Sequence, residues 1–280
     1  MVERRPWLTA LTHAILIVGC LVIAFPIYTT FVASTHTLDK IASSFPIFPG
    51  GQIIENYRQA LTVGSGEVGA TVVRMMINSA IMAFGIALGK IFISLLAAYA
   101  IVYFRFRFRM TCFWLIFITL MLPVEVRILP TYKVVSDLHM LNSYPGLILP
   151  LIASATATFL FRQFFMTIPD ELCEAVRIDG GGPIRFFFDI LLPMSRTSIA
   201  ALFVILFIYG WNQYLWPLMI TNDEKYYTVF LGIKRMLDVG EGQADWHIIM
   251  ASTMLAMIPP VFVVIFMQKQ FVKGMTETEK

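Results

Sequence analysis

Charged residues are scarce in this chain. Asp, Glu, Lys and Arg make up 14% of its 280 residues, whereas 58% are hydrophobic and the mean hydropathy is +0.75. A soluble globular domain carries about 25% charged residues, so the composition excludes that class and indicates an integral membrane protein. The net charge of +3 is small and dispersed, and we therefore expect no nucleic-acid partner.

The chain also has few of the residues that build metal or catalytic centres. Its cysteines and histidines are Cys20, Cys112, Cys173, His13, His36, His139 and His247. None of them stands at metal-ligand or Ser-His-Asp spacing. The nearest approach to a phosphate loop, residues 85–91, is one residue short between its glycines and lacks Ser or Thr after the lysine. We therefore expect no catalytic residue, no metal site and no cofactor bound by this chain, and we predict that it is not an enzyme.

Long apolar runs are what the chain has in abundance. A helix needs about 20 residues to cross a hydrocarbon layer of about 30 Å. Six nearly uncharged runs approach or exceed that length: residues 11–31, 76–103, 110–132, 144–161, 198–220 and 247–271. They predict an all-α polytopic membrane protein with six transmembrane helices and with both chain ends on the same side.

Lysine and arginine indicate which side that is, because short cytoplasmic loops retain these residues. With both termini inside, twelve of the 21 lie on the cytoplasmic side and eight outside, and Lys90 lies within a span. The contrast is sharpest in the short basic loop that contains Arg105, Arg107 and Arg109. We expect a bacterial inner-membrane protein with cytoplasmic termini.

The predicted organisation has two parts. Residues 1–71 form an N-terminal anchor helix and a periplasmic connection, and residues 72–280 form a core with five transmembrane helices. We expect the first span to be an uncleaved anchor and not a signal peptide, because residues 6–38 lack formal charge over far more than an apolar core of about 7–15 residues. Gly85 and Gly89 predict a small-residue packing face on the second helix.

A charged insert, residues 162–197, interrupts the apolar core. Thr167 is predicted to cap a helix that Pro169 opens, and Gly180 to stop it. Pro183 is predicted to open a second helix, which Pro193 ends. At helical spacing, the first helix carries a polar stripe and an apolar stripe: Glu171, Glu174 and Arg177 on one, Leu172, Ala175, Val176 and Ile178 on the other.

The insert resembles the EAA loop of ABC importer permeases. The matching residues are Glu174-Ala175, Gly180 and Ile190-x-Leu192-Pro193, at the spacing of that motif, while Val176 replaces its second alanine. The resemblance implies that this loop is a coupling helix that enters a cleft of a cytoplasmic ATPase subunit, with coupling residues Glu171, Glu174, Ala175, Asp179 and Gly180. The alternative is an amphipathic helix lying on lipid, which its acidic residues disfavour beside anionic headgroups.

Further motifs extend the resemblance to carbohydrate-type importer permeases over essentially the whole chain. They are Asn78-Ser79, residues 97–100, 121–123 and 128–130, and Gly210-Trp211-Asn212-Gln213. Residues 123–127, 158–165 and 209–217 look more narrowly like the permeases of glycerol-phosphate importers. The resemblance implies the type I importer fold, a heterodimer with a sister permease, two ATPase subunits that use ATP and Mg, and a periplasmic substrate-binding protein.

The cargo pathway is the least determined part. Lys90 lies roughly 22–24 Å from Arg74 and from Arg105 along a helix, near the middle of the membrane, where it needs a partner or water. The candidate pathway residues are Lys90, Glu125, Arg127, Trp211, Asn212 and Gln213. They favour sn-glycerol-3-phosphate or glycerophosphodiesters as cargo. A neutral sugar, an ion-coupled secondary transporter and a membrane scaffold remain open as alternatives, and each pathway residue has helix packing as its structural alternative.

Overall fold

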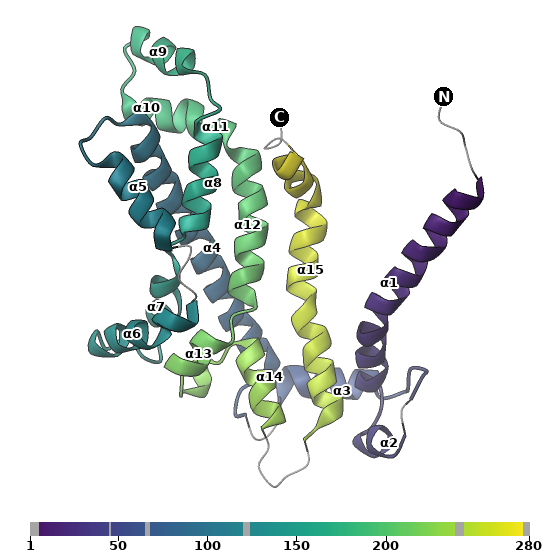
Figure 1. Cartoon of the computed structure of the whole chain (residues 1–280). Coiled ribbons are helices and arrows are strands. Elements are labelled where there is room, and N and C mark those ends of the chain that lie inside the picture. Colours follow the sequence, from purple (N-terminus) through teal and green to yellow (C-terminus); the bar gives the residue numbers. More distant parts are fainter. Residues whose placement is uncertain (1–5, 45, 65–67, 120–123, 239–243, 277–280) are drawn as a thin grey trace. The chain divides into compact units, whose positions relative to one another are not determined.

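All regular structure that the computed structural model describes is helical, without a strand in residues 6–44, 46–64, 68–119, 124–238 and 244–276 (Figure 1). The predicted all-α class is confirmed. The chain divides into two compact units, Met1–Val73 with Gly232–Met257, and Arg74–Leu231 with Ile258–Lys280. The predicted division into residues 1–71 and 72–280 stays a prediction.

The first unit is built around α1, Pro6–Ser34, a predominantly apolar helix of 29 residues that is long enough to cross a membrane. Its short helices are α2, Leu38–Ser43, and α3, Ile53–Thr62. Asn56 of α3 donates hydrogen bonds of 2.8 Å to the carbonyls of Ser34 and His36, just beyond the end of α1. Most of α1 before that point is exposed apolar surface, as a helix that faces lipid requires.

The second unit contains the remaining helices. They are α5 (Arg109–Ile118), α6 (Val124–Asp137), α7 (Tyr144–Ile148), η2 (Leu149–Leu151), α8 (Ala155–Phe165), α9 (Asp170–Ile178), α10 (Pro183–Phe186), η3 (Phe187–Leu191), α11 (Leu192–Met194), α12 (Arg196–Trp211), α13 (Leu215–Ile220) and η4 (Glu224–Tyr226). Three more run from one unit into the other: α4 (Val72–Tyr103), α14 (Val229–Leu237) and α15 (Trp246–Thr276).

Among the described residues, three helices are long and apolar enough to cross a membrane alone: Trp7–Ser34, Val72–Tyr103 and Trp246–Lys269. Two bent pairs pass the same test only if each pair is one span: Tyr144–Leu151 with Ala155–Phe165, bent by 49°, and Pro183–Met194 with Arg196–Trp211, bent by 70°. The predicted span 110–132 is divided between α5 and α6, and its residues 120–123 lie outside the described part of the chain.

The predicted span 198–220 is not one helix, because α12 ends at Trp211 and α13 begins at Leu215. Pro217 explains the break, since proline has no N–H and its ring conflicts with the carbonyl four residues earlier in a continuous helix. The Gln213 side chain donates a hydrogen bond of 3.2 Å to the Tyr209 carbonyl at the end of α12. A polar break thus interrupts an apolar span.

The predicted small-residue face of α4 is confirmed as a packing surface. A Cβ atom added at Gly85 would lie 2.7 Å from the Ile148 side chain, and one added at Gly89 would lie 2.6 Å from the Ile152 side chain. Both isoleucines belong to the bent span that starts with α7. Glycine is therefore what permits α4 and this span to approach so closely.

Candidate functional site

The helix α9, Asp170–Ile178, forms where the charged insert predicts it, but it starts differently. Its N-cap residue is Pro169, without a side-chain cap hydrogen bond. The predicted cap by Thr167 is wrong, because the Thr167 hydroxyl donates instead to the Phe164 carbonyl at 2.7 Å, at the end of α8. Asp170 and Glu171 stand in the first turn, where a negative charge interacts favourably with the helix dipole.

The helix ends in a Schellman motif centred on Gly180. Gly180 has a φ of +73°, and its N–H donates to the Arg177 carbonyl at 3.1 Å. The N–H of Gly181 donates to the Val176 carbonyl at 2.7 Å. These bonds satisfy carbonyls that the helix leaves free at its end, and the left-handed residue reverses the chain toward Pro183. The predicted stop at Gly180 is confirmed.

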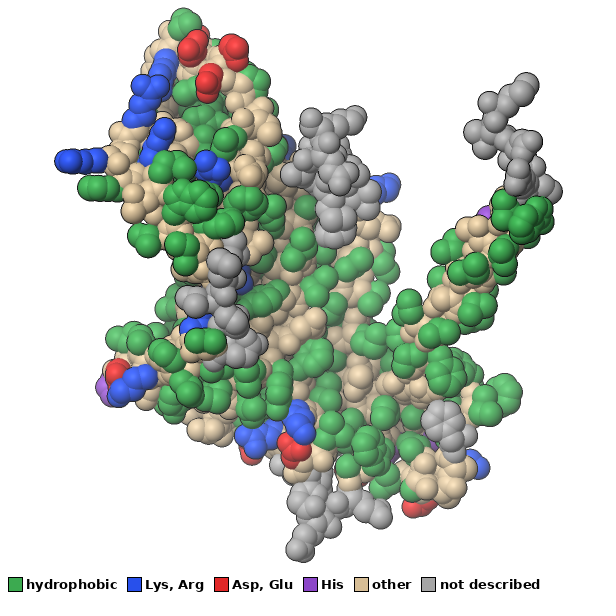
Figure 2. Space-filling model, in the orientation of Figure 1, with side chains coloured by type: hydrophobic (Ala, Val, Ile, Leu, Met, Phe, Trp, Pro, Cys, Tyr) green, Lys and Arg blue, Asp and Glu red, His purple; other side chains and the backbone are tan. Residues whose placement is uncertain are grey.

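The outer face of α9 is acidic and partly apolar. Glu171, Glu174 and Ala175 are exposed, and so are Asp179 and Gly180 at its end. Asp and Glu side chains gather on α9, with Lys and Arg beside them (Figure 2).

Two residues of the predicted apolar stripe therefore lie on the wrong side. Ala175 is exposed and Ile178 is 84% exposed, whereas Leu172, Cys173 and Val176 are half-buried. The inward face follows the contacts that α9 makes with the rest of the unit, which periodicity alone does not reveal. The loop thus exposes a small residue, Ala175, and a large apolar one, Ile178, between carboxylates.

The loop is held to α4 by two tyrosines. The Tyr99 hydroxyl donates to the Pro183 carbonyl at 2.8 Å, at the start of α10, and the Tyr103 hydroxyl donates to the Phe165 carbonyl at 3.3 Å, at the end of α8. The Tyr99 ring lies 5.1 Å from the Phe187 ring, and the Tyr103 ring lies 5.0 Å from that of Phe186. Both sides of the insert are therefore fastened to one long helix.

The second helical segment of the insert ends at Met194, one residue past the predicted end at Pro193. It continues from α10 through the π-helical turn η3 into α11, and bends by 70° at Ser195. A π turn widens the helix by one residue, which gives room to a proline that follows it. The Ser195 hydroxyl donates to the Leu191 carbonyl at 2.6 Å, one of the carbonyls near the bend.

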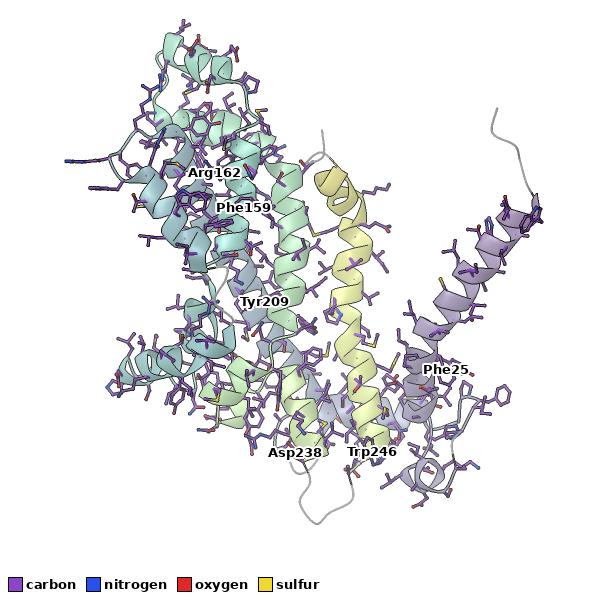
Figure 3. All side chains as sticks on the ribbon, viewed as in Figure 1. Phe25, Phe159, Arg162, Tyr209, Asp238 and Trp246 are labelled. Atoms are coloured by element: carbon purple, nitrogen blue, oxygen red, sulfur yellow. The ribbon has the colours of Figure 1, made fainter. Side chains whose placement is uncertain are left out.

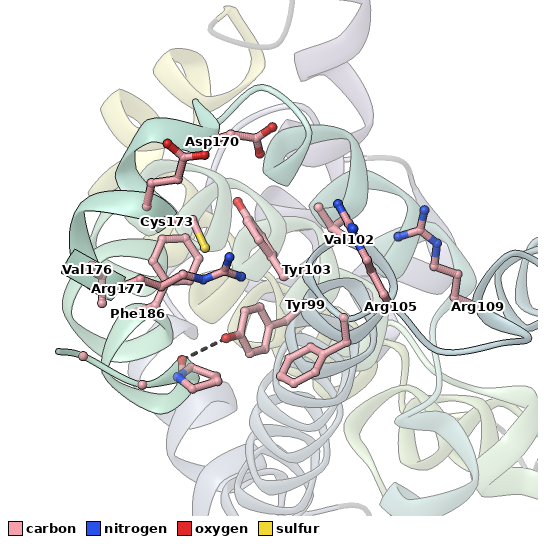
Figure 4. Close-up of a pocket in the computed structure, with 15 residues that line it drawn as sticks. Tyr99, Val102, Tyr103, Arg105, Arg109, Asp170, Cys173, Val176, Arg177 and Phe186 are labelled. Atoms are coloured by element: carbon pink, nitrogen blue, oxygen red, sulfur yellow. Dashed lines mark hydrogen bonds between the residues drawn. The ribbon is translucent and has the colours of Figure 1, made fainter. Parts of the chain in front are cut away.

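A cavity of about 690 Å³ separates α9 from the end of α4 (Figure 4). Its charged lining groups are Arg105, Arg109, Asp170, Glu174 and Arg177. The rest of the wall is made by Tyr99, Val102, Tyr103, Phe104, Cys173, Val176, Gly181, Gly182, Pro183 and Phe186. The basic loop and the acidic helix lie far apart in the sequence, and only the fold brings them to one cavity.

A second polar feature surrounds Lys90 in the middle of α4. Lys90 is 7% exposed, and its Nζ lies 3.8 Å from the centroid of the Tyr209 ring of α12, a cation–π contact. Arg127 of α6 is near enough for its charge to act on Lys90. The predicted need of Lys90 for a partner is thus met by an aromatic face, and by no carboxylate among the described side chains.

Arg127 and Gln213 line a cavity of about 230 Å³ together with the Tyr209 that covers Lys90. Its other lining residues are Ile128, Thr131, Pro150, Leu151, Leu215 and Trp216. Two of the predicted pathway residues, Arg127 and Gln213, therefore line one cavity, and Lys90 contacts the Tyr209 ring that lines it with them. Tyr209 was missed as a site residue, although its hydroxyl on an apolar helix was a signal that could have found it.

The other predicted pathway residues lie elsewhere. Trp211 is buried and stacks on Phe207 at 5.9 Å, which fits its packing alternative. Asn212 caps the end of α12 and is exposed. The side chain of Glu125 lies outside the described part of the chain.

An aromatic cluster between α5 and α8 also went unpredicted. The Arg162 guanidinium lies 4.2 Å from the Phe113 ring, and Phe159 contacts Phe117 at 5.5 Å (Figure 3). This cluster fastens α5 to the helix that leads into the insert. No group of three His, Cys, Asp or Glu side chains in the described ranges is placed to hold a metal ion.

The comparisons with known proteins agree over the full length. One relative is the sn-glycerol-3-phosphate transport system permease protein UgpE of Agrobacterium fabrum, which is 57% identical over 282 residues. The protein of the same name from Escherichia coli O6:K15:H31 is 56% identical over 281 residues. Each match covers 100% of both chains. A crystal structure of a bacterial ABC transporter involved in the import of the acidic polysaccharide alginate matches with a TM-score of 0.82 at 20% identity, covering 97% of this chain and 99% of that one. This likeness shows the fold alone.

A family model described as the binding-protein-dependent transport system inner membrane component matches residues 90–277, which include the insert and the second polar cavity. With its full-length relatives, this match shows that the chain belongs to the inner-membrane permease components of binding-protein-dependent ABC importers.

Proposed function

We propose that this chain is the permease subunit of an ATP-driven importer that carries sn-glycerol-3-phosphate, or glycerophosphodiesters, across the inner membrane by alternating access. The observation that carries the proposal is the identity of 56–57% over the full length to permeases named for sn-glycerol-3-phosphate transport.

The charges around Lys90 support an anionic cargo. A cation in the middle of a membrane costs about 2.5–3.5 kcal/mol on insertion scales, and a second cation nearby adds repulsion. Arg127 lines the cavity with Tyr209 and Gln213, and the Tyr209 ring contacts the Lys90 ammonium, so both cations stand beside one cavity. A phosphate group that passes this point relieves the repulsion, whereas a neutral sugar leaves it in place.

The energy enters through partner chains. In the proposed assembly, a sister permease completes the pore, and two ATPase subunits bind ATP and Mg on the cytoplasmic side. A periplasmic binding protein delivers the cargo. Glu171, Glu174, Ala175, Asp179 and Gly180 are the surface that docks on an ATPase subunit, and this chain holds no cofactor of its own.

The movement passes through the base of the insert. When the ATPase subunits close on ATP, they carry α9 with them, and the attachments of Tyr99 and Tyr103 transmit the displacement to α4. Since α4 carries Lys90, the cargo site turns with it. Hydrolysis resets the lever. This scheme places both termini and the basic loop at Arg105–Arg109 on the cytoplasmic side.

The test is uptake of labelled sn-glycerol-3-phosphate by vesicles that contain the whole transporter and its loaded binding protein. We expect uptake to require ATP and to be competed by glycerol phosphate but not by maltose. Glu174→Lys should abolish uptake and cargo-stimulated ATP hydrolysis while the chain still inserts. Asp189→Lys is the matched control, because it reverses an exposed charge of the same insert that only makes a surface ion pair with Arg185.

Three results would contradict the proposal. Uptake that persists after ATP depletion favours an ion-coupled carrier. Competition by maltose favours the neutral-sugar alternative. Equal loss of coupling in Glu174→Lys and Asp189→Lys removes the specific role of Glu174 and leaves only the charge of the loop.

A further inference from the structure

The cavity beneath α9 carries both signs of charge without internal neutralisation. Arg105, Arg109 and Arg177 line it with Asp170 and Glu174, yet no two opposite charges of this set lie within the 4.0 Å of an ion pair. Figure 4 shows Arg105 and Arg109 on one wall, with Arg177 and Asp170 across the space. Unpaired charges that face one cavity are arranged for a ligand that carries both signs.

The cavity lies where lipid headgroups are expected. Beside it, the loop after α4 alternates arginines with three phenylalanines, Phe104, Phe106 and Phe108, which are 42%, 41% and 61% exposed. Aromatic side chains with exposed rings concentrate at the membrane interface, and arginines there extend their charged ends toward the headgroups. Phe104 and Arg105 also line the cavity, so the interface continues into it.

The cavity is of suitable size and chemistry. Its volume of about 690 Å³ falls within the range of about 300–1,000 Å³ that holds small ligands. The hydroxyls of Tyr99 and Tyr103 already donate to backbone carbonyls, so their oxygens are left to accept from a ligand. Their rings, with that of Phe186, offer aromatic faces to an ammonium group.

We propose that this cavity binds a glycerophosphoethanolamine group, with the phosphate held by Arg105, Arg109 and Arg177 and the ammonium by Asp170. An anionic phosphoglycerol headgroup brings no cation to the Asp170 carboxylate. A choline headgroup brings a cation that cannot donate hydrogen bonds. The same group occurs in a membrane phospholipid and in its soluble deacylated ester, and the position beside the exposed phenylalanines favours the lipid.

The inference relies on the proposed function for the cytoplasmic placement of the loop, and it adds regulation to the same lever. The α9 and α10 helices form one wall of the cavity, and the end of α4 forms the other. A headgroup between them fixes the base of the lever to the membrane and to α4. Transport therefore depends on lipid headgroup chemistry as well as on lipid charge.

The test uses the complete transporter in vesicles of phosphatidylethanolamine with phosphatidylglycerol, or of phosphatidylcholine with the same share of phosphatidylglycerol. Phosphatidylethanolamine retained by the purified complex is counted by native mass spectrometry, and cargo-stimulated ATP hydrolysis is measured in parallel. The double variant Arg105→Gln with Arg109→Gln should bind phosphatidylethanolamine about tenfold more weakly, because it loses charge-assisted hydrogen bonds to the phosphate. Arg107→Gln is the matched control, since Arg107 belongs to the same loop but does not line the cavity.

Binding of phosphatidylethanolamine by the wild type and by Arg107→Gln, with loss in the double variant, supports the proposal. Asp170→Asn should then admit phosphatidylglycerol. Soluble glycerophosphoethanolamine that binds the wild-type complex in phosphatidylcholine vesicles, counted by the same mass spectrometry without the binding protein, identifies the ester as a sufficient ligand, and failure to bind identifies the lipid. Equal retention by the double variant and the wild type overturns the site. Because retention is measured without transport, a failure of glycerol phosphate uptake is a separate result.

Discussion

Gly180 offers the sharpest test of why the insert has its sequence. Its φ of +73° lies in the left-handed region, where an L-residue with a Cβ atom is strained by roughly 1–2 kcal/mol. A Cβ atom added there meets nothing within 4 Å, so the chain itself leaves space for a side chain. The expected penalty of Gly180→Ala is therefore conformational, with no clash inside this subunit.

Two explanations of this glycine give opposite orders of activity. If the φ angle matters, Gly180→Asn should be milder than Gly180→Ala, because asparagine tolerates the left-handed region. If an ATPase subunit approaches too closely for any side chain, the larger asparagine should be worse. We expect the first order. A penalty of about 1 kcal/mol lowers the population of the capped loop roughly fivefold, which reduces coupling without abolishing it.

The assay is ATP hydrolysis stimulated by loaded binding protein in reconstituted vesicles, with uptake measured on the same preparation. Hydrogen exchange at the Gly181 amide reports the cap directly, because this N–H donates to the Val176 carbonyl at 2.7 Å. Faster exchange in Gly180→Ala than in Gly180→Asn, with activity in the matching order, is the expected result. An alanine variant at least as active as the asparagine variant would refute the conformational argument.

Three further outcomes are expected. Lys90→Gln should raise the KM for glycerol phosphate by about tenfold through the loss of a charge-assisted contact. Tyr209→Phe keeps the ring beneath the ammonium and should change the KM little. Equal KM values for Lys90→Gln and the wild type would exclude a cargo contact. Gly89→Ala forces a methyl group against the Ile152 side chain. The clash costs about 1–3 kcal/mol and outweighs the gain in helix propensity, so the Tm should fall. Adding Ile152→Ala should restore the Tm. An unaltered Tm would mean that the helices separate freely. Tyr99→Phe removes the hydrogen bond to the start of α10, which is worth about 1 kcal/mol. The variant should consume more ATP per cargo molecule transported. An unchanged ratio of ATP to cargo would show that this bond does not transmit movement.

Features decided by neighbouring residues could be predicted from the sequence. In a membrane every backbone polar group must be satisfied within the helix itself, so a long apolar run is sufficient to indicate a span. The ends of α9 were predictable for the same reason, because Pro169 and Gly180 act on their own turns of the chain. The cap assigned to Thr167 failed because the end of α8, which lies outside that local pattern, took its hydroxyl.

What joins distant parts of the chain was decided by the tertiary structure alone. The Lys90 ammonium meets the Tyr209 ring, and the basic loop after α4 shares a cavity with the acidic helix α9. Such contacts depend on helix crossings and bends, and a hydropathy pattern carries no information about either. By itself, the sequence determined that the chain crosses a membrane and bears a charged helical insert, because those properties are local. Only the packed helices decided which charges face one another, because that is a matter of distance in space.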